Sequence, residues 1–324
     1  ERIAILAGAG LQRLAAGVVA EQHDDGDDRE HGDEREREHA ADEGPHPPQP
    51  WQTRAAAVAD RTLRRVRTLD AGQPAILDDD LLIAGDNLVA MASLPAGHFD
   101  MAYLDPPFNT GIEQRRGALH YADAFEDYSA FLEPRLRRTR ELLAPHGTLY
   151  LHLDYREAHR AKILLDELFG EDCFLNELIW IYDYGGRPKR RWPAKHDTIL
   201  VYVRDRALYH FDDDEVDREP YMAPGLVGPE KAARGKRPSD CWWHTIVPTN
   251  SREKTGYPTQ KPEGIVRRMV GASSRPGGWC LDPFAGSGTL GAVCRALGRR
   301  YVLLEANPEA IAISSARLEH APAA

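Results

Sequence analysis

From residue 78 onward, short apolar runs alternate with stretches whose apolar residues recur at helical spacing. The runs that predict strands are 81–84, 99–104, 147–153, 198–203, 279–281 and 301–304, and the stretches that predict helices are 127–143, 156–169, 262–274 and 288–297. Strands that alternate with helices along a chain form a mostly parallel central sheet with helices on both faces. The pattern therefore predicts an α/β fold over residues 76–324.

Acidic residues follow four of the predicted strands at the point where each run ends. They are Asp86, Asp105, Asp282 and Glu305. Ligands of open α/β sheets bind at the carboxyl ends of the strands, which lie along one edge of the sheet. We therefore expect these four side chains to gather at one ligand-binding edge.

Residues 1–75 differ in composition from the rest of the chain. The stretch 21–44 holds twelve acidic residues against three arginines, so it carries −9 of the formal net charge of −10. Several prolines follow between residues 45 and 50, and this composition favours an acidic extension that is disordered or loosely attached. The other residues are close to neutral overall, and the net charge therefore does not exclude nucleic-acid binding, which depends on local patches.

Several classes of protein are disfavoured by what the chain lacks. No run of 18 apolar residues occurs, so a membrane-spanning helix is not expected. The first 20 residues lack the charged start and the cleavage site of a secretory signal, and we expect a cytoplasmic protein. The four cysteines show no CxxC spacing, so we expect reduced thiols and no metal site.

A glycine-rich turn follows the predicted strand at 279–281 and opens a predicted helix. Gly286 and Gly288 allow the backbone to approach a ligand closely. Glu305, at the end of the next strand, can accept hydrogen bonds from ribose hydroxyls. Gly291 completes a GxGxxG spacing, so this turn by itself suits a nicotinamide dinucleotide as well as S-adenosylmethionine.

The segment Asp105-Pro106-Pro107-Phe108 separates these two alternatives, because a dehydrogenase would not explain it. Two consecutive prolines fix φ, restrict the preceding residue and remove two backbone donors. The rigid turn presents a carboxylate, a proline carbonyl and an aromatic ring together. An exocyclic base amine is a weak nucleophile because its lone pair is delocalised into the ring. Asp105 and the Pro106 carbonyl can accept its two hydrogens and favour the nucleophilic form, while Phe108 can stack on the base.

The order of the two motifs resembles the β group of DNA amino-methyltransferases, in which a DPPY-type catalytic motif precedes an FxGxG-type cofactor motif. Here Asp105–Phe108 precedes Phe284–Gly288. The resemblance covers residues 78–315 and also includes Gly85–Leu88, Leu151–Asp154, Lys195–Tyr202 and Tyr257–Pro262. It implies a Rossmann-like methyltransferase fold with a circularly permuted motif order and S-adenosyl-L-methionine as the methyl donor.

The resemblance also implies roles for individual residues. The catalytic set is Asp105, Pro106, Pro107 and Phe108, and the cofactor set is Asp86, Asp282, Phe284, Gly286, Ser287, Gly288, Glu305, Thr259 and Lys261. Within the cofactor set, Asp86 is expected near the adenine, Glu305 at the ribose hydroxyls, and Thr259 and Lys261 at the methionine carboxylate. Family members with aspartate at the head of the catalytic motif mostly modify adenine N6, whereas those with serine more often modify cytosine N4. Asp105 therefore favours adenine.

A base inside a duplex must be flipped out before its amine can react, so the expected partner is double-stranded DNA. The residues predicted to contact DNA form two basic clusters, Arg187, Lys189, Arg190, Arg191 and Lys195 in the first and Lys236 and Arg237 in the second. The second cluster lies in residues 205–258, a stretch rich in proline, glycine and charge that interrupts the alternation of strands and helices. We interpret this stretch as an inserted target-recognition region.

Other functions remain open from the sequence. Cytosine N4 methylation needs the same chemistry, and a DNA-binding subunit whose catalysis has lapsed could keep the same fold. Enzymes that methylate RNA bases or protein glutamine have a related turn, but they usually place the cofactor motif first. The resemblance further implies a homodimer, and it leaves open whether a cognate restriction endonuclease acts on the same DNA site.

Overall fold

The computed structural model describes residues 66–67, 75–111, 114–116, 119–121 and 123–320. Its centre is a nine-stranded sheet in the order β1-β2-β11-β10-β3-β6-β8-β7-β9. The strands are β1 (Val66–Arg67), β2 (Leu81–Ala84), β3 (Phe99–Leu104), β6 (Leu143–Leu153), β7 (Phe174–Ile181), β8 (His196–Val203), β9 (Cys241–Trp243), β10 (Trp279–Asp282) and β11 (Arg300–Glu305). A separate antiparallel hairpin joins β4 (Gln114–Arg116) to β5 (Leu119–Tyr121).

Of the nine strands in this sheet, β8 runs against the others. The first six strands in sheet order are β1, β2, β11, β10, β3 and β6, and they pair in parallel with one another. Strand β8 is antiparallel to both β6 and β7, and β9 is parallel to β7. Parallel strands need crossover connections, and helices usually provide them. The predicted mostly parallel sheet is therefore confirmed.

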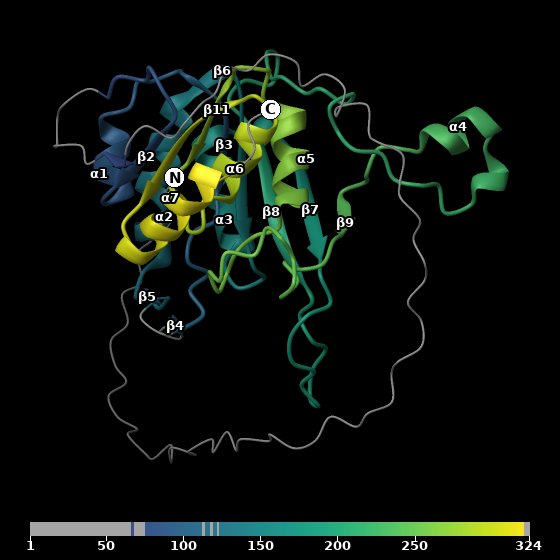
Figure 1. Ribbon diagram of the computed structural model, residues 1–324, viewed down its shortest axis with the longest axis horizontal. Helices are drawn as coiled ribbons and strands as arrows, with labels where there is room; N and C mark the ends of the chain where they lie inside the picture. The colour runs from purple at the N-terminus through teal and green to yellow at the C-terminus, as the bar shows by residue number, and fades with distance from the viewer. Residues whose placement is uncertain (1–65, 68–74, 112–113, 117–118, 122, 321–324) are drawn as a thin grey trace, which may run out of the picture. The chain divides into compact units, whose positions relative to one another are not determined.

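Helices cover both faces of the sheet (Figure 1). One face carries α1 (Asn87–Ala92), α2 (Tyr128–Leu142) and α3 (Ala158–Phe169), and the other carries α5 (Glu263–Ser273), α6 (Thr289–Ala296) and α7 (Pro308–His320). Successive residues of a strand point to opposite faces, so Leu81 and Ile83 join one core while Leu82 joins the other. None of the helices in the described ranges is long and apolar enough to cross a lipid bilayer.

All six predicted strands and all four predicted helices are present, with differences mainly at their ends. The structure adds the helices α1 and α7, the strands β1, β4, β5, β7 and β9, the short helix α4 (Pro229–Arg234) and two 3-10 turns, Glu171–Cys173 and Pro224–Leu226. β7 is not apparent from the sequence because the exposed Asn176 and Glu177 interrupt its apolar pattern. The predicted acidic extension at 1–75 lies outside the described residues, apart from residues 66–67 and 75.

The direction of β8 decides where the inserted region lies. We call the edge at which β3 ends the carboxyl edge and the opposite edge the amino edge. Residues 204–240 leave the end of β8 and return at the start of β9, so both ends of this segment are at the amino edge. The loop 182–195 and the segment 244–262 adjoin the carboxyl edge instead. In Figure 1, the loop that joins β7 to β8 extends below these strands, whereas α4 lies to the right of the sheet, near its upper end.

Candidate active site

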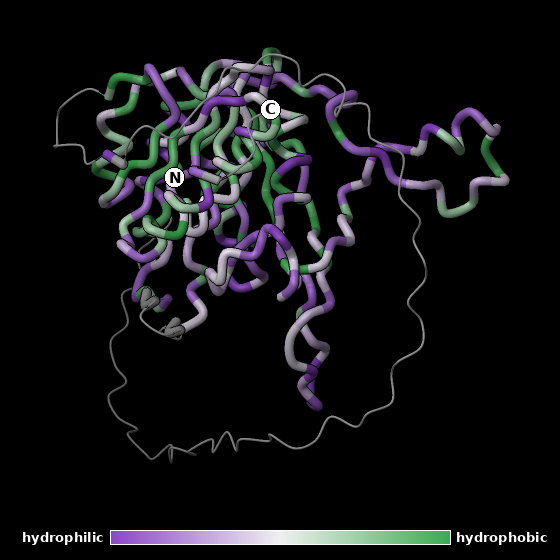
Figure 2. The backbone as a smooth tube through the Cα atoms, in the orientation of Figure 1, coloured by the Kyte–Doolittle hydropathy of each residue, from purple (hydrophilic) through white to green (hydrophobic). Residues whose placement is uncertain are grey.

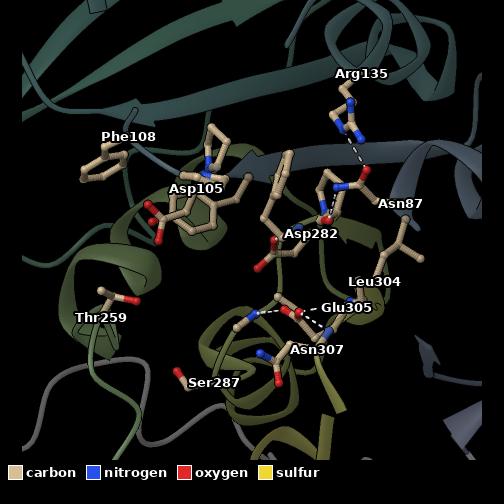
Figure 3. A pocket seen from close by; sticks show the side chains of 18 of the residues that line it. Asn87, Asp105, Phe108, Arg135, Thr259, Asp282, Ser287, Leu304, Glu305 and Asn307 are labelled. Atoms are coloured by element: carbon tan, nitrogen blue, oxygen red, sulfur yellow. Dashed lines mark hydrogen bonds between the residues drawn. The ribbon is translucent and has the colours of Figure 1, made fainter. Parts of the chain in front are cut away.

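Four neighbouring strands bring acidic residues to the carboxyl edge. In sheet order, Asp86 follows β2, Glu305 ends β11, Asp282 ends β10 and Asp105 follows β3. All four line one cavity with a volume of about 370 Å³, which lies in the range of small-molecule sites. Figure 3 shows Asp105 and Phe108 at one end of this cavity and Glu305 at the other. The sheet therefore brings the four predicted acids into a single site.

The turn Asp105–Phe108 is held by side chains from two distant segments. The Tyr128 hydroxyl of α2 donates a hydrogen bond of 2.7 Å to the Pro107 carbonyl. Lys261 Nζ donates to both carboxylate oxygens of Asp105, at 2.8 and 2.6 Å. Within the described part of the chain, no backbone or side-chain group donates to the Pro106 carbonyl. The Asp105 carboxylate and the Pro106 carbonyl thus remain the two acceptors that the sequence suggested.

The chain leaves this turn through a residue in the left-handed conformation. Asn109 has a φ of 55°, its backbone N–H donates to Asp123 Oδ1 at 2.7 Å, and its side-chain amide donates to Glu157 Oε1 at 2.8 Å. Its side-chain oxygen accepts a hydrogen bond of 2.9 Å from the Phe125 N–H. Asparagine adopts this conformation more readily than most residues, and Asn109 therefore fixes the path of the chain after Phe108.

The glycine-rich turn between β10 and α6 uses left-handed backbone at both predicted glycines. The φ angles are 50° at Gly286 and 71° at Gly288, a region in which glycine has no steric penalty. A Cβ on Gly286 would lie 3.2 Å from the Tyr257 ring, and one on Gly288 would lie 3.1 Å from the Ser314 hydroxyl. Gly286 lines the cavity, whereas Gly288 is the N-cap of α6 and contributes to the shape of the turn.

Glu305 is fixed by three backbone N–H groups. Its carboxylate accepts hydrogen bonds from Gly286 at 2.8 Å, Ala306 at 3.0 Å and Asn307 at 2.9 Å. Burial raises the pKa of Glu305, and these hydrogen bonds counteract the rise. A carboxylate offers about four lone-pair positions, so it can still accept a hydrogen bond from a ligand. This geometry fits the predicted contact with ribose hydroxyls.

The pKa of Asp282 responds both to burial and to the other acids of the site. Its side chain is buried and accepts a hydrogen bond of 2.9 Å from the Phe284 N–H. Burial, together with the charges of Asp105 and Glu305, raises the pKa of Asp282 well above its usual range. A ligand that brings positive charge to the cavity would counteract this rise. The sulfonium and ammonium groups of S-adenosylmethionine would do so, and the donor set therefore fits this cofactor.

The remaining predicted cofactor residues reach the cavity in different ways. Phe284, Ser287 and Thr259 line it. Asp86 also lines it, but its carboxylate caps α1 by accepting the N–H groups of Leu88 and Val89 at 3.0 and 3.1 Å. A contact of Asp86 with the adenine of the cofactor therefore stays a prediction.

Lys261 lies against the catalytic turn as well as in the cavity. Its side chain is 11% exposed, and its ammonium is 4.9 Å from the centre of the Phe108 ring in addition to its ion pair with Asp105. The predicted contact with the methionine carboxylate stays a prediction. The structure adds the ion pair between the Lys261 ammonium and the Asp105 carboxylate.

One wall of the cavity was not predicted from the sequence. Phe131 and Arg135 of α2 line it, and the Arg135 guanidinium lies 4.1 Å from the centre of the Phe131 ring. Arg135 Nε donates to Asn87 Oδ1 at 2.8 Å, and the Asn87 amide donates to the Pro283 carbonyl at 2.8 Å. These contacts join segments that are far apart in sequence, so no local motif marks them.

A buried chain of hydrogen bonds runs from the cavity wall across four strands. The Tyr103 hydroxyl of β3 is 2.8 Å from His152 Nδ1 of β6, and His152 Nε2 is 3.2 Å from Asp197 Oδ2 of β8. The Tyr182 hydroxyl, just after β7, donates to Asp197 Oδ1 at 3.2 Å. The His152 ring also lies 5.9 Å from the Phe108 ring. His152 and Asp197 belong to motifs quoted above for the resemblance, which assigned them no role.

The two predicted DNA-binding clusters lie at opposite edges of the sheet. Arg187, Lys189, Arg190, Arg191 and Lys195 are in the loop between β7 and β8, at the carboxyl edge. Lys236 and Arg237 are in the segment at the amino edge, where Arg237 pairs with Asp213 at 3.5 Å. The interpretation of residues 205–258 as one recognition region stays a prediction. Its two parts lie at different edges, because residues 204–240 project away from Asp105 and residues 244–258 adjoin it.

Together, the fold and the cavity fit a Rossmann-like methyltransferase that uses S-adenosylmethionine. The chain belongs to the DNA methylase family of N6 and N4 amino-methyltransferases, because the model of that family matches residues 99–316. The type II methyltransferase M.HpaI of Haemophilus parainfluenzae is 31% identical over 241 residues, which cover 74% of each chain. The DNA adenine methyltransferase YhdJ of Escherichia coli (strain K12) is 30% identical, over 74% of this chain and 82% of that one.

Solved structures agree with the fold. The cytosine-N4-specific PvuII DNA methyltransferase has a TM-score of 0.57 and 17% identity, over 76% of this chain and 90% of that chain. M1.HpyAVI in complex with S-adenosylmethionine has a TM-score of 0.52 and 21% identity, over 73% of this chain and 98% of that chain. These likenesses show the fold, and the family match makes the protein a DNA methyltransferase of the N6/N4 group.

Proposed function

We propose that the protein is a β-group enzyme that methylates the N6 amine of adenine in double-stranded DNA. The observation that carries the proposal is the aspartate at the head of the Asp105–Phe108 turn, presented beside the cavity and held by Lys261. The adenine methyltransferase YhdJ among the relatives supports the same base. Cytosine N4 is the alternative that the experiment below separates from it.

The residues of the turn would act on the amine in complementary ways. Asp105 and the Pro106 carbonyl would accept one amine hydrogen each, which concentrates the lone pair on the nitrogen. Phe108 would stack on the flipped base and hold its plane. Lys261 would keep the Asp105 carboxylate aimed at the amine. S-adenosylmethionine supplies an electrophilic methyl group when it is bound.

Residues at the other end of the cavity would hold the cofactor. Glu305 would accept hydrogen bonds from the ribose hydroxyls, and Gly286 would let the backbone approach closely. Asp282, Phe284, Ser287 and Thr259 line the space between Glu305 and the catalytic turn. Gly288 would act by fixing the turn that carries Ser287.

DNA would bind across the carboxyl edge. The loop 182–195 would contact the phosphates, and residues 244–258 would be the part of the inserted region that faces the base sequence. Both segments adjoin the carboxyl edge, where Asp105 follows β3. A homodimer and a cognate restriction endonuclease that acts on the same site stay predictions.

The test is single-molecule sequencing of DNA from cells that express the unaltered chain, Asp105→Ala or Asp105→Asn. We expect N6-methyladenine at one sequence motif with the unaltered chain. Both variants should lose about 10²- to 10³-fold in rate, because a preorganised polar contact to the reacting amine is removed. Calorimetry should show that both variants still bind S-adenosylmethionine. Methylation at cytosine N4 would contradict the base assignment, and full activity of Asp105→Ala would contradict the role of the turn.

A further inference from the structure

The loop between β7 and β8 carries a tryptophan that the proposed function leaves unused. Trp192 is 95% exposed, although a large aromatic ring is normally at least partly buried. A single exposed apolar residue needs no explanation by itself. Here, however, the residue lies in a loop that adjoins the carboxyl edge, where the catalytic turn begins.

The root of this loop is held by its own residues. Lys195 Nζ donates to the carbonyls of Tyr184 and Gly185 at 2.9 and 2.5 Å. Arg187 donates to both carboxylate oxygens of Asp183, at 2.9 and 3.0 Å. These contacts hold the base of the loop together, and two of the five cations of the loop are engaged in them.

At the tip of the loop, in contrast, the positive charges are free to interact with phosphates. Lys189, Arg190 and Arg191 are exposed, and none of them forms an ion pair with a described residue. Figure 2 shows the hydrophilic tip extending beyond the ends of β7 and β8. Trp192 follows directly after these three cations. The tip therefore combines an electrostatic attraction to phosphate with one flat apolar surface.

We propose that Trp192 enters the base stack of the duplex and occupies the gap from which the target base leaves. This rests on the proposed function, since it requires DNA to lie across the carboxyl edge. An aromatic ring has a face on which any base can stack, and apolar wedges of this kind unstack base steps in other DNA-binding proteins. Arg190 and Arg191 would hold the phosphates beside the gap while the flipped base meets Phe108.

The experiment compares the unaltered chain with Trp192→Ala and Trp192→Phe on two duplexes. Both contain the recognition site found by sequencing, and they differ only in the base opposite the target, which is thymine in one and an abasic site in the other. Removing the partner base lowers the cost of flipping. We expect Trp192→Ala to lose at least about 10-fold in kcat/KM on the paired duplex, and to recover most of that loss on the abasic one. Trp192→Phe should stay close to the unaltered chain on both.

Met222→Ala is the matched control, because Met222 is 98% exposed in the segment at the amino edge. It should match the unaltered chain on both duplexes. If Trp192→Ala lost the same factor in kcat/KM on the paired and abasic duplexes, the proposal that Trp192 enters the base stack would be overturned. It would also be overturned if this variant lost nothing on either duplex. Absence of methyl transfer by the unaltered chain would instead overturn the proposed function. The two failures are therefore distinguishable.

Discussion

At the scale of one residue, the Asp282 carboxyl lowers the folding stability of the ligand-free protein and lines the cavity where the ligand would bind. Its carboxylate is buried between Asp105 and Glu305, and burial raises its pKa well above the usual range. A group whose pKa is raised on folding contributes its stability fully below the unfolded pKa of about 4, and loses it as the pH rises through the folded pKa. A titratable carboxyl at this position therefore costs the ligand-free fold stability as the pH rises.

We predict that Asp282→Asn is more stable than the unaltered chain at neutral pH, by on the order of 1 kcal/mol. The amide oxygen can still accept the Phe284 N–H, while the buried charge is removed. Urea unfolding at pH 5 and pH 8 should show a larger advantage at pH 8. Calorimetry should show weaker binding of S-adenosylmethionine.

The exposed Asp240 offers the control for that measurement. Asp240→Asn should leave both the stability and its pH dependence unchanged. An Asp282→Asn protein that is less stable at both pH values would show that the carboxylate is not a source of strain.

At the scale of elements, β8 places the loop 182–195 and the segment 204–240 at opposite edges of the sheet, although the two lie close together in the sequence. Because β8 runs against its neighbours, the loop before it lies at the carboxyl edge and the segment after it at the amino edge. Arg268 of α5 anchors the latter segment through Asp217 at 2.8 Å and Glu219 at 3.0 Å. Of the two, the loop lies at the same edge as the catalytic turn.

We predict that the double variant Arg190→Ala/Arg191→Ala binds DNA more weakly and with a smaller dependence on salt. Each lost phosphate contact should reduce the slope of log K against log[salt] by about 1, so the pair should reduce it by about 2. Fluorescence anisotropy with a labelled duplex at several salt concentrations measures this slope.

The double variant Lys236→Ala/Arg237→Ala serves as the comparison, and its slope should match that of the unaltered chain. If instead this second pair lowered the slope and the loop pair did not, DNA would bind at the amino edge. That result would support the interpretation of residues 205–258 as the target-recognition region.

At the scale of the whole molecule, the described part of the chain contains two hydrophobic cores, one on each face of the sheet. Helices α1, α2 and α3 complete one core, α5, α6 and α7 complete the other, and the buried residues of both begin at Leu81 and Leu82. The cavity is likewise lined by residues from Gly85 onward.

We therefore predict that a chain without residues 1–60 keeps its fold and binds S-adenosylmethionine with unchanged affinity. Circular dichroism and calorimetry on the shortened chain measure the two properties. Loss of cofactor binding in a folded, shortened protein would show that the acidic extension contributes to the site.

The sequence by itself determined the fold class and the composition of the catalytic and cofactor turns. Apolar periodicity predicted the six central strands because burial on both faces makes each of them a continuous apolar run. The two prolines of the catalytic turn and the glycines of the cofactor turn act through their own φ angles, so their effect is local and readable.

Only the tertiary structure decided which distant side chains complete the site. Lys261 meets Asp105 across 156 residues, Tyr128 holds Pro107, and His152 meets Asp197 inside the sheet. It also decided the edge at which each basic cluster lies, since the direction of β8 follows from its pairing with β6 and β7 and not from its own residues. Hydrogen bonds and ion pairs between distant segments depend on how the strands pair and how the helices pack. A local stretch of sequence does not specify this arrangement.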